Sequence, residues 1–114
     1  MNLGRVVMLA LALGAMTYIT ASAAGVNAYR VFARVTLNGK PASEATVEVK
    51  YERYQGPYSR TAATDYAGSA TLLVEEDSKR NCWIAFTRSK PRLYSSTECF
   101  DAKEQPRTLL LEIR

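Results

Sequence analysis

The chain has 114 residues, with 15 Lys and Arg against 11 Asp and Glu, a formal net charge of +4 and no histidine. That length is enough for one domain. The missing histidine excludes Ser-His and Cys-His nucleophile activation as well as histidine-ligated zinc. The basic residues are spread along the chain, which argues against nucleic-acid binding and leaves at most a weak attraction to anionic surfaces.

Residues 1–23 have the layout of a cleaved secretory signal peptide. Arg5 is the only charged residue of this segment, an apolar stretch runs over residues 6–19, and Ala-Ser-Ala ends it. The alternative is a membrane anchor, but the apolar stretch is shorter than the ~20 residues that a spanning helix needs. We expect cleavage after Ala23 or one residue later. The mature chain, residues 24–114, is then secreted or periplasmic and has no membrane span.

The mature chain alternates apolar and polar side chains in short runs. In the first run, Val31, Ala33 and Val35 face one way while Arg30 and Arg34 face the other. The alternation predicts about seven short strands, at residues 29–37, 46–54, 59–64, 69–74, 82–87, 93–99 and 108–113. No segment shows a sustained helical period. Strands with one apolar face need a second sheet to cover it, so we expect one all-β domain, a seven-stranded two-sheet sandwich.

Both cysteines, Cys82 and Cys99, lie in the part that we expect to be exported. In an oxidising compartment they predict one disulfide. A hairpin that turns at Lys90 and Pro91 places them directly opposite each other, which suits disulfide geometry. The alternative is a redox-active or metal-binding pair. Neither a C-x-x-C spacing nor a third thiol supports it, so we expect a structural disulfide, no metal and no cofactor.

Two runs of the sequence carry a family resemblance. Residues 31–49 read VFARVTLNGKPASEATVEV, and residues 61–74 read TAATDYAGSATLLV. These runs resemble the carboxypeptidase regulatory-like and transthyretin-like modules, in which x-G-x-P-x-x-x-A-x-V-x-V precedes a T-D-x-x-G turn. The matching residues are Gly39, Pro41, Ala45, Val47, Val49, Thr64, Asp65 and Gly68. The resemblance covers about half of the mature chain. It implies an immunoglobulin-like or transthyretin-like sandwich of seven strands, used as a structural or binding module without catalysis.

A tyrosine- and arginine-rich segment is the main candidate for a binding site. Tyr54 and Tyr58 fall on or beside a predicted loop, with Arg53 and Arg60 interleaved. Tyrosine and arginine are favoured at binding surfaces because each offers rigid area together with a polar tip. The structural alternative is that Tyr51 and Tyr54 close one end of the sandwich and that Tyr58 has no role.

Trp83 is the second candidate. If Cys82, Ile84 and Phe86 face the core, then Trp83 faces outward, with Tyr94 near it on the opposite strand. A register shifted by one residue would instead bury Trp83 in the core.

Catalysis is not expected. Glu75, Glu76 and Asp77 form an acidic run, but consecutive acids do not converge on calcium without a loop to fold them, so we expect a solvated turn. We therefore expect an exported, non-catalytic binding module that recognises a protein or glycan through the Tyr/Arg loop. The alternatives are a structural subunit that assembles through an open sheet edge, a secreted inhibitor or effector, and a small-ligand carrier. The sequence leaves the oligomeric state open.

Overall fold

The computed structural model describes residues 27–53 and 56–114. The predicted signal peptide at residues 1–23 and Tyr54 of the Tyr/Arg loop lie outside the described residues.

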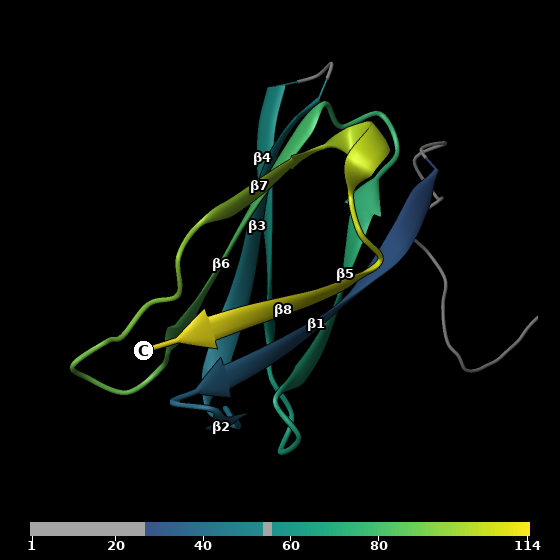
Figure 1. Cartoon of the computed structure of the whole chain (residues 1–114). Helices are drawn as coiled ribbons and strands as arrows, with labels where there is room; N and C mark the ends of the chain where they lie inside the picture. The colour runs from purple at the N-terminus through teal and green to yellow at the C-terminus, as the bar shows by residue number, and fades with distance from the viewer. Residues whose placement is uncertain (1–26, 54–55) are drawn as a thin grey trace, which may run out of the picture.

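The described part of the chain is built almost entirely of strands (Figure 1). In chain order the elements are β1 (Ala28–Leu37), β2 (Lys40–Pro41), β3 (Ala45–Arg53), β4 (Gly56–Ala63), β5 (Ser69–Glu75), β6 (Arg80–Thr87), β7 (Glu98–Asp101), the 3-10 turn η3 (Ala102–Glu104) and β8 (Thr108–Ile113). All but two of the predicted strands are close to their expected bounds. β4 begins earlier than predicted, and β7 begins later and is shorter than the predicted strand at residues 93–99.

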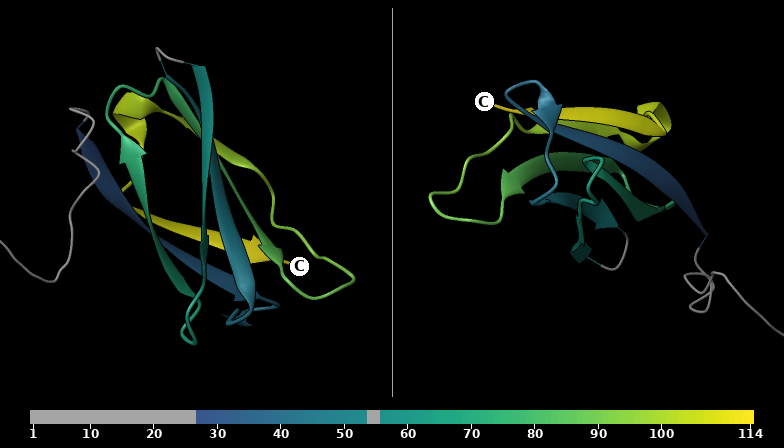
Figure 2. Two further views of the ribbon diagram at one scale, coloured as in Figure 1. Left: turned by 180° about the vertical axis from the view of Figure 1, so that it is seen from behind. Right: turned by 90° about the horizontal axis from the view of Figure 1, so that it is seen from below.

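The strands form two four-stranded sheets that pack as a sandwich. In the first sheet β1 is central: it pairs antiparallel with β2 and β5 and parallel with β8. The second sheet has the order β4-β3-β6-β7, with every pair antiparallel. Seen from below, the two sheets lie in separate layers (Figure 2). The prediction of an all-β, two-sheet sandwich is confirmed.

The core lies between the inner faces of the two sheets, as the alternation of apolar and polar residues along the strands predicts. Val31 and Val35 of β1 meet Val47 and Val49 of β3, and all four side chains are fully buried. Residues on the same strands that alternate with them are more exposed. Because successive strand side chains point to opposite faces, the pattern of the sequence is enough to assign this part of the core.

The turn between β4 and β5 is held by the residues that the sequence indicated. Asp65 Oδ1 accepts hydrogen bonds from the backbone N–H groups of Ala67 and Ser69, each at 2.9 Å. Gly68 has a φ of 78°, and a Cβ atom there would lie 2.6 Å from the carbonyl oxygen of Val35. Gly68 is therefore required both by its backbone conformation and by the close approach of β1.

The disulfide joins Cys82 of β6 to Cys99 of β7, which are directly paired in the ladder as predicted. The remainder of the predicted 93–99 strand is different. Tyr94 makes an isolated bridge to Phe86, and strand pairing resumes only at Glu98, which pairs with Trp83. The two pairings differ by one residue in register, so an extra residue between Tyr94 and Glu98 interrupts the strand.

Candidate functional site

The structure brings together three of the predicted binding residues, Arg53, Tyr58 and Arg60. They lie with Tyr51 and Glu75 at the side of the sandwich where β4 and β5 are the outer strands, and we call these five residues the Tyr–Arg cluster. Tyr51 pairs with Tyr58 across the β3–β4 ladder, so both side chains point to the same face of the sheet. Sequence spacing alone indicated that the tyrosines and arginines were neighbours, and the ladder aligns them.

Glu75 is the centre of the cluster. Only 7% of the residue is exposed. Its carboxylate accepts hydrogen bonds from Arg53 Nη1, at 3.0 and 3.2 Å, and from the Tyr51 hydroxyl group at 3.2 Å. Arg60 Nη2 is 3.7 Å from the same carboxylate. A buried carboxylate needs partners of this kind to stay charged, and here the two arginines supply them.

Glu75 corrects the expectation that residues 75–77 form a solvated turn. Glu76 and Asp77 are exposed, but Glu75 is buried and ion-paired. The physical reason is that Glu75 is still part of β5, so the strand carries it to the two arginines of the facing sheet.

Tyr58 is the part of the cluster that a partner can reach, with 39% of the residue exposed. Its ring centroid is 5.7 Å from that of Tyr51. The guanidinium carbon of Arg53 is 4.4 Å from the centroid of the Tyr58 ring, and that of Arg60 is 5.2 Å from it. Such cation–π contacts hold the ring in place. Tyr58 is therefore a partly exposed aromatic ring that lies against two guanidinium groups.

Hydrogen bonds and burial change the pKa values of two groups of the cluster, Tyr51 and Arg60. Burial is the largest effect on Tyr51 and raises its pKa above the ordinary value of 10.0, while the hydrogen bond donated by Arg60 acts in the opposite direction. Burial is the largest single effect on Arg60 and opposes its charge, but its hydrogen bond to Tyr51 and its electrostatic interactions with Tyr51, Tyr58 and Glu75 together outweigh burial and raise the pKa of the guanidinium group. Tyr51 is therefore neutral and Arg60 charged at neutral pH.

Two open cavities flank the cluster. One, of about 720 Å³, lies over the outer face of β3, β4 and β6 and is lined in part by Lys50, Pro57, Tyr58 and Cys82. The other, of about 340 Å³, lies between β4 and β5 and is lined in part by Tyr58, Arg60 and Leu73. Tyr58 lines both cavities, so a ligand in either one contacts it.

Trp83 does not form a surface patch, and the prediction that it faces outward is wrong. Its exposure is 0%. Trp83 pairs with Val49 of β3, whose side chain faces the core, and paired residues point to the same face. The register alternative therefore holds: Trp83 is a core residue, and Cys82 and the disulfide lie on the outer face of the sheet.

A buried polar group explains how the core accommodates the indole. Trp83 Nε1 donates a hydrogen bond to Gln105 Oε1 at 2.8 Å, and Asn81 Nδ2 donates to the same oxygen at 3.0 Å. Sequence reasoning missed Gln105, which follows η3 outside any strand. The only signal for Asn81 was its place two residues before Trp83, on the same face of the strand.

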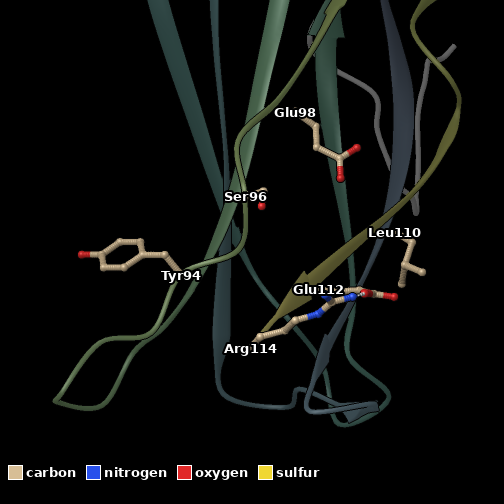
Figure 3. A pocket seen from close by; sticks show the side chains of 6 residues that line it. All are labelled: Tyr94, Ser96, Glu98, Leu110, Glu112 and Arg114. Carbon is tan, nitrogen blue, oxygen red and sulfur yellow. Dashed lines mark hydrogen bonds and ion pairs between the residues drawn. The ribbon is translucent and has the colours of Figure 1, made fainter.

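A third cavity lies away from the Tyr–Arg cluster, between β8 and the segment that leads into β7 (Figure 3). Its volume is about 370 Å³. The side chains that line it are Tyr94, Ser96, Glu98, Leu110, Glu112 and Arg114. Figure 3 shows that Tyr94 points away from the other five, and Arg114 is hydrogen-bonded to Glu112. This cavity contains none of the residues that the sequence predicted as a site.

Over residues 27–53 and 56–114, the chain has no helix that is both long and apolar enough to cross a bilayer. Nor does this part of the chain hold a group of three or more His, Cys, Asp or Glu side chains placed to bind a metal ion.

Comparison of the whole chain with protein-family models and with curated proteins finds no match. The resemblance to carboxypeptidase regulatory-like and transthyretin-like modules therefore stays a prediction from the residues that carry it.

Proposed function

We propose that this chain is an exported, non-catalytic binding module that recognises a protein or a glycan through the Tyr–Arg cluster. The observation that carries the proposal is the state of Tyr58: its ring is partly exposed, yet it is held between Arg53 and Arg60. A rigid aromatic ring with a polar tip contributes contact area at low entropic cost. The flanking guanidinium groups add hydrogen-bond donors for a carboxylate or a sugar hydroxyl group.

The arrangement of charge favours binding over catalysis. The only carboxylate of the cluster, Glu75, is already engaged by Arg53 and Tyr51. A carboxylate that is held in this way is a poor general base. The disulfide is compatible with a secreted or periplasmic location, where such bonds persist.

A capture experiment tests the proposal. The mature chain, with its disulfide formed, serves as bait in the extracellular or periplasmic extract of the source organism, beside a Tyr54→Ala/Tyr58→Ala double variant. Tyr66→Ala is the matched control, because Tyr66 is 91% exposed and makes no contact with the cluster that the structure records. A partner retained by the wild type and by Tyr66→Ala, but lost by the double variant, supports the proposal.

Two further readouts make the result interpretable. The double variant must keep its thermal midpoint within a few degrees of the wild type, since unfolding would remove any binding surface. Periodate oxidation of the extract separates the two classes of partner, because it destroys glycans and spares most protein surfaces. If the double variant is folded and still retains the same partner, recognition does not depend on these tyrosines and the proposal is wrong.

A further inference from the structure

Strand β4 has one unpaired edge. In the second sheet it stands at the end of the order β4-β3-β6-β7, and among residues 27–53 and 56–114 its only ladder is with β3. An exposed strand edge presents free N–H and C=O groups to any other strand of suitable geometry. The free groups of this edge belong to the main chain, whereas the Tyr–Arg cluster is built from side chains, although Ser59 and Thr61 line the cavity between β4 and β5 together with Tyr58 and Arg60.

The ladder with β3 determines which groups of β4 are free. The backbone N–H of Thr64 donates to the carbonyl oxygen of Ala45 at 2.9 Å. In an antiparallel ladder alternate residues point their main-chain groups toward the partner, so those of Arg60 and Ala62 also point toward β3. The main-chain groups of Ser59, Thr61 and Ala63 consequently point outward, away from β3.

The residues along this free edge are exposed and uncharged. Ser59, Thr61 and Ala63 are all exposed, and so is Pro57, which precedes them. Natural proteins usually protect long edges with lysine, with bulges or by covering them. On β4 the protective residues are Pro57, at one end of the strand, and Arg60, whose charged side chain points inward to Tyr51.

The other outer strands of the described structure are less accessible. On β5, Thr71 is exposed but Leu73 is half-buried, and Glu75 is held by the facing arginines. β7 spans only Glu98–Asp101 and runs directly into η3. β8 is bridged near its end by Ser95, which pairs with Ile113. β4 is therefore the long edge that is open to another strand.

We propose that a second copy of this chain pairs antiparallel with β4, with the two-fold axis at Thr61. In this register Thr61 lies opposite Thr61 of the second copy, and Ser59 lies opposite Ala63 of the second copy. Each of these pairs joins residues whose free N–H and C=O groups face each other. Two sandwiches would thereby share one continuous sheet.

Repulsion between like charges and the missing N–H of proline favour the register centred on Thr61 over registers centred one or two residues away. A pair centred on Arg60 would place two guanidinium groups directly opposite each other, which is unfavourable. A pair centred on Ser59 would place Pro57, which has no N–H to donate, opposite Thr61. Centring on Thr61 instead places Arg60 opposite Ala62 of the second copy, and Pro57 falls beyond the ladder.

Charged residues introduced at Thr61, on the proposed two-fold axis, test both the interface and its register. In the mature chain, Thr61→Lys and Thr61→Glu each place two like charges opposite each other, so each variant should dissociate about tenfold more readily than the wild type. An equimolar mixture places Lys opposite Glu and should restore the dimer. Thr108→Lys is the matched control, since it adds the same charge at an exposed position of β8, which does not line the cavity between β4 and β5. Sedimentation equilibrium over a range of concentrations measures all five samples, the wild type included.

Each outcome decides the proposal. A wild type that is monomeric up to hundreds of micromolar overturns it, as do single variants that dimerise like the wild type. A mixture that fails to restore the dimer overturns the register. Hydrogen exchange gives a second measurement: the amides of Ser59, Thr61 and Ala63 should become protected as concentration rises. If they become protected only when a different protein is added, the edge pairs with a foreign strand and the second copy is excluded.

The outcome is separable from that of the capture experiment. Thr61→Lys leaves Tyr58 and both arginines in place, so a monomeric variant that still captures a partner supports both proposals.

Discussion

Trp83 Nε1 donates a hydrogen bond to Gln105 Oε1 across 2.8 Å, between two residues that are both buried inside the sandwich. The same oxygen accepts a second hydrogen bond from Asn81 Nδ2 at 3.0 Å. One amide thus satisfies two donors of the core. A buried donor left without an acceptor costs more than an average hydrogen bond stabilises, so the loss of this acceptor would be felt in the stability of the domain.

Replacing that amide is the first prediction. Gln105→Met keeps the length of the side chain but removes the acceptor for Trp83 and Asn81. We expect the free energy of unfolding to fall by about 1–3 kcal/mol, because the buried Trp83 N–H loses its acceptor, whereas the Asn81 amide keeps its contact with the Tyr29 hydroxyl group at 3.4 Å. Urea unfolding measures the change, and Glu104→Gln at an exposed neighbour is the control. A loss below about 0.5 kcal/mol, the range of an ordinary surface substitution, would show that water replaces the amide.

The second prediction concerns the centre of the Tyr–Arg cluster. Glu75→Gln removes the charge that Arg53 and Arg60 share, while keeping the shape of the side chain. We expect a loss of about 1–3 kcal/mol, since both arginines are partly solvated and recover some hydration. Glu76→Gln, at the exposed neighbour, should change stability by less than about 0.5 kcal/mol. Equal effects of the two substitutions would contradict the assignment of Glu75 as the central residue.

The third prediction separates two reasons for requiring glycine. Gly39 and Gly68 both have positive φ, 84° and 78°, but only Gly68 lacks space for a Cβ atom. Gly39→Ala should therefore cost about 1–2 kcal/mol from backbone strain alone. Gly68→Ala should cost clearly more, because its Cβ atom would lie 2.6 Å from the carbonyl oxygen of Val35. Thermal unfolding of both variants measures the difference, and equal losses would mean that β1 shifts freely.

The fourth prediction concerns the disulfide. Cys82→Ser/Cys99→Ser should lower the free energy of unfolding by about 3 kcal/mol through the entropy of the opened loop. The intact protein from the exported fraction should contain no titratable thiol. Two free thiols in that fraction would contradict the bond between β6 and β7.

The core strands and the disulfide pairing are predictable from sequence because both depend on local patterns. Alternation in β1 and β3 assigns Val31 and Val49 to the core, and the symmetry of a hairpin pairs Cys82 with Cys99. Hairpin symmetry determines which residues are opposite each other, but not which face they point to. The face of β6 is determined by its ladder with β3, where Trp83 meets Val49, and that contact is not a local property of the sequence.

In the candidate site, too, local sequence patterns predict some of the neighbours, and contacts between the sheets determine the others. The sequence places Arg53, Tyr58 and Arg60 near one another, and the structure joins them. The sequence pattern does not indicate Glu75, which lies 22 residues from Arg53 in the chain and contacts it from the other sheet. An acidic residue at the end of a strand is usually solvated, and only the approach of the two sheets turns it into the ion partner of both arginines.

The last prediction is a pH dependence. Burial raises the pKa of Tyr51 above its ordinary value of 10.0 in the folded protein, so folding favours the neutral hydroxyl group. The resulting stability is fully present below the pKa of the unfolded chain, about 10, and is lost as pH rises through the higher pKa of the folded state. The melting temperature should therefore fall between pH 9 and 11.

Substitutions of single tyrosines show which residues cause the fall in melting temperature between pH 9 and 11. Tyr51→Phe should flatten the decline, because phenylalanine has no proton to lose. Tyr29, whose pKa burial also raises, leaves a residual slope that a Tyr29→Phe/Tyr51→Phe double variant should reduce further. Tyr66→Phe should keep the full decline, since Tyr66 is exposed. If the melting temperatures of Tyr51→Phe and Tyr66→Phe decline equally from pH 9 to 11, ionisation of Tyr51 is not what destabilises the protein.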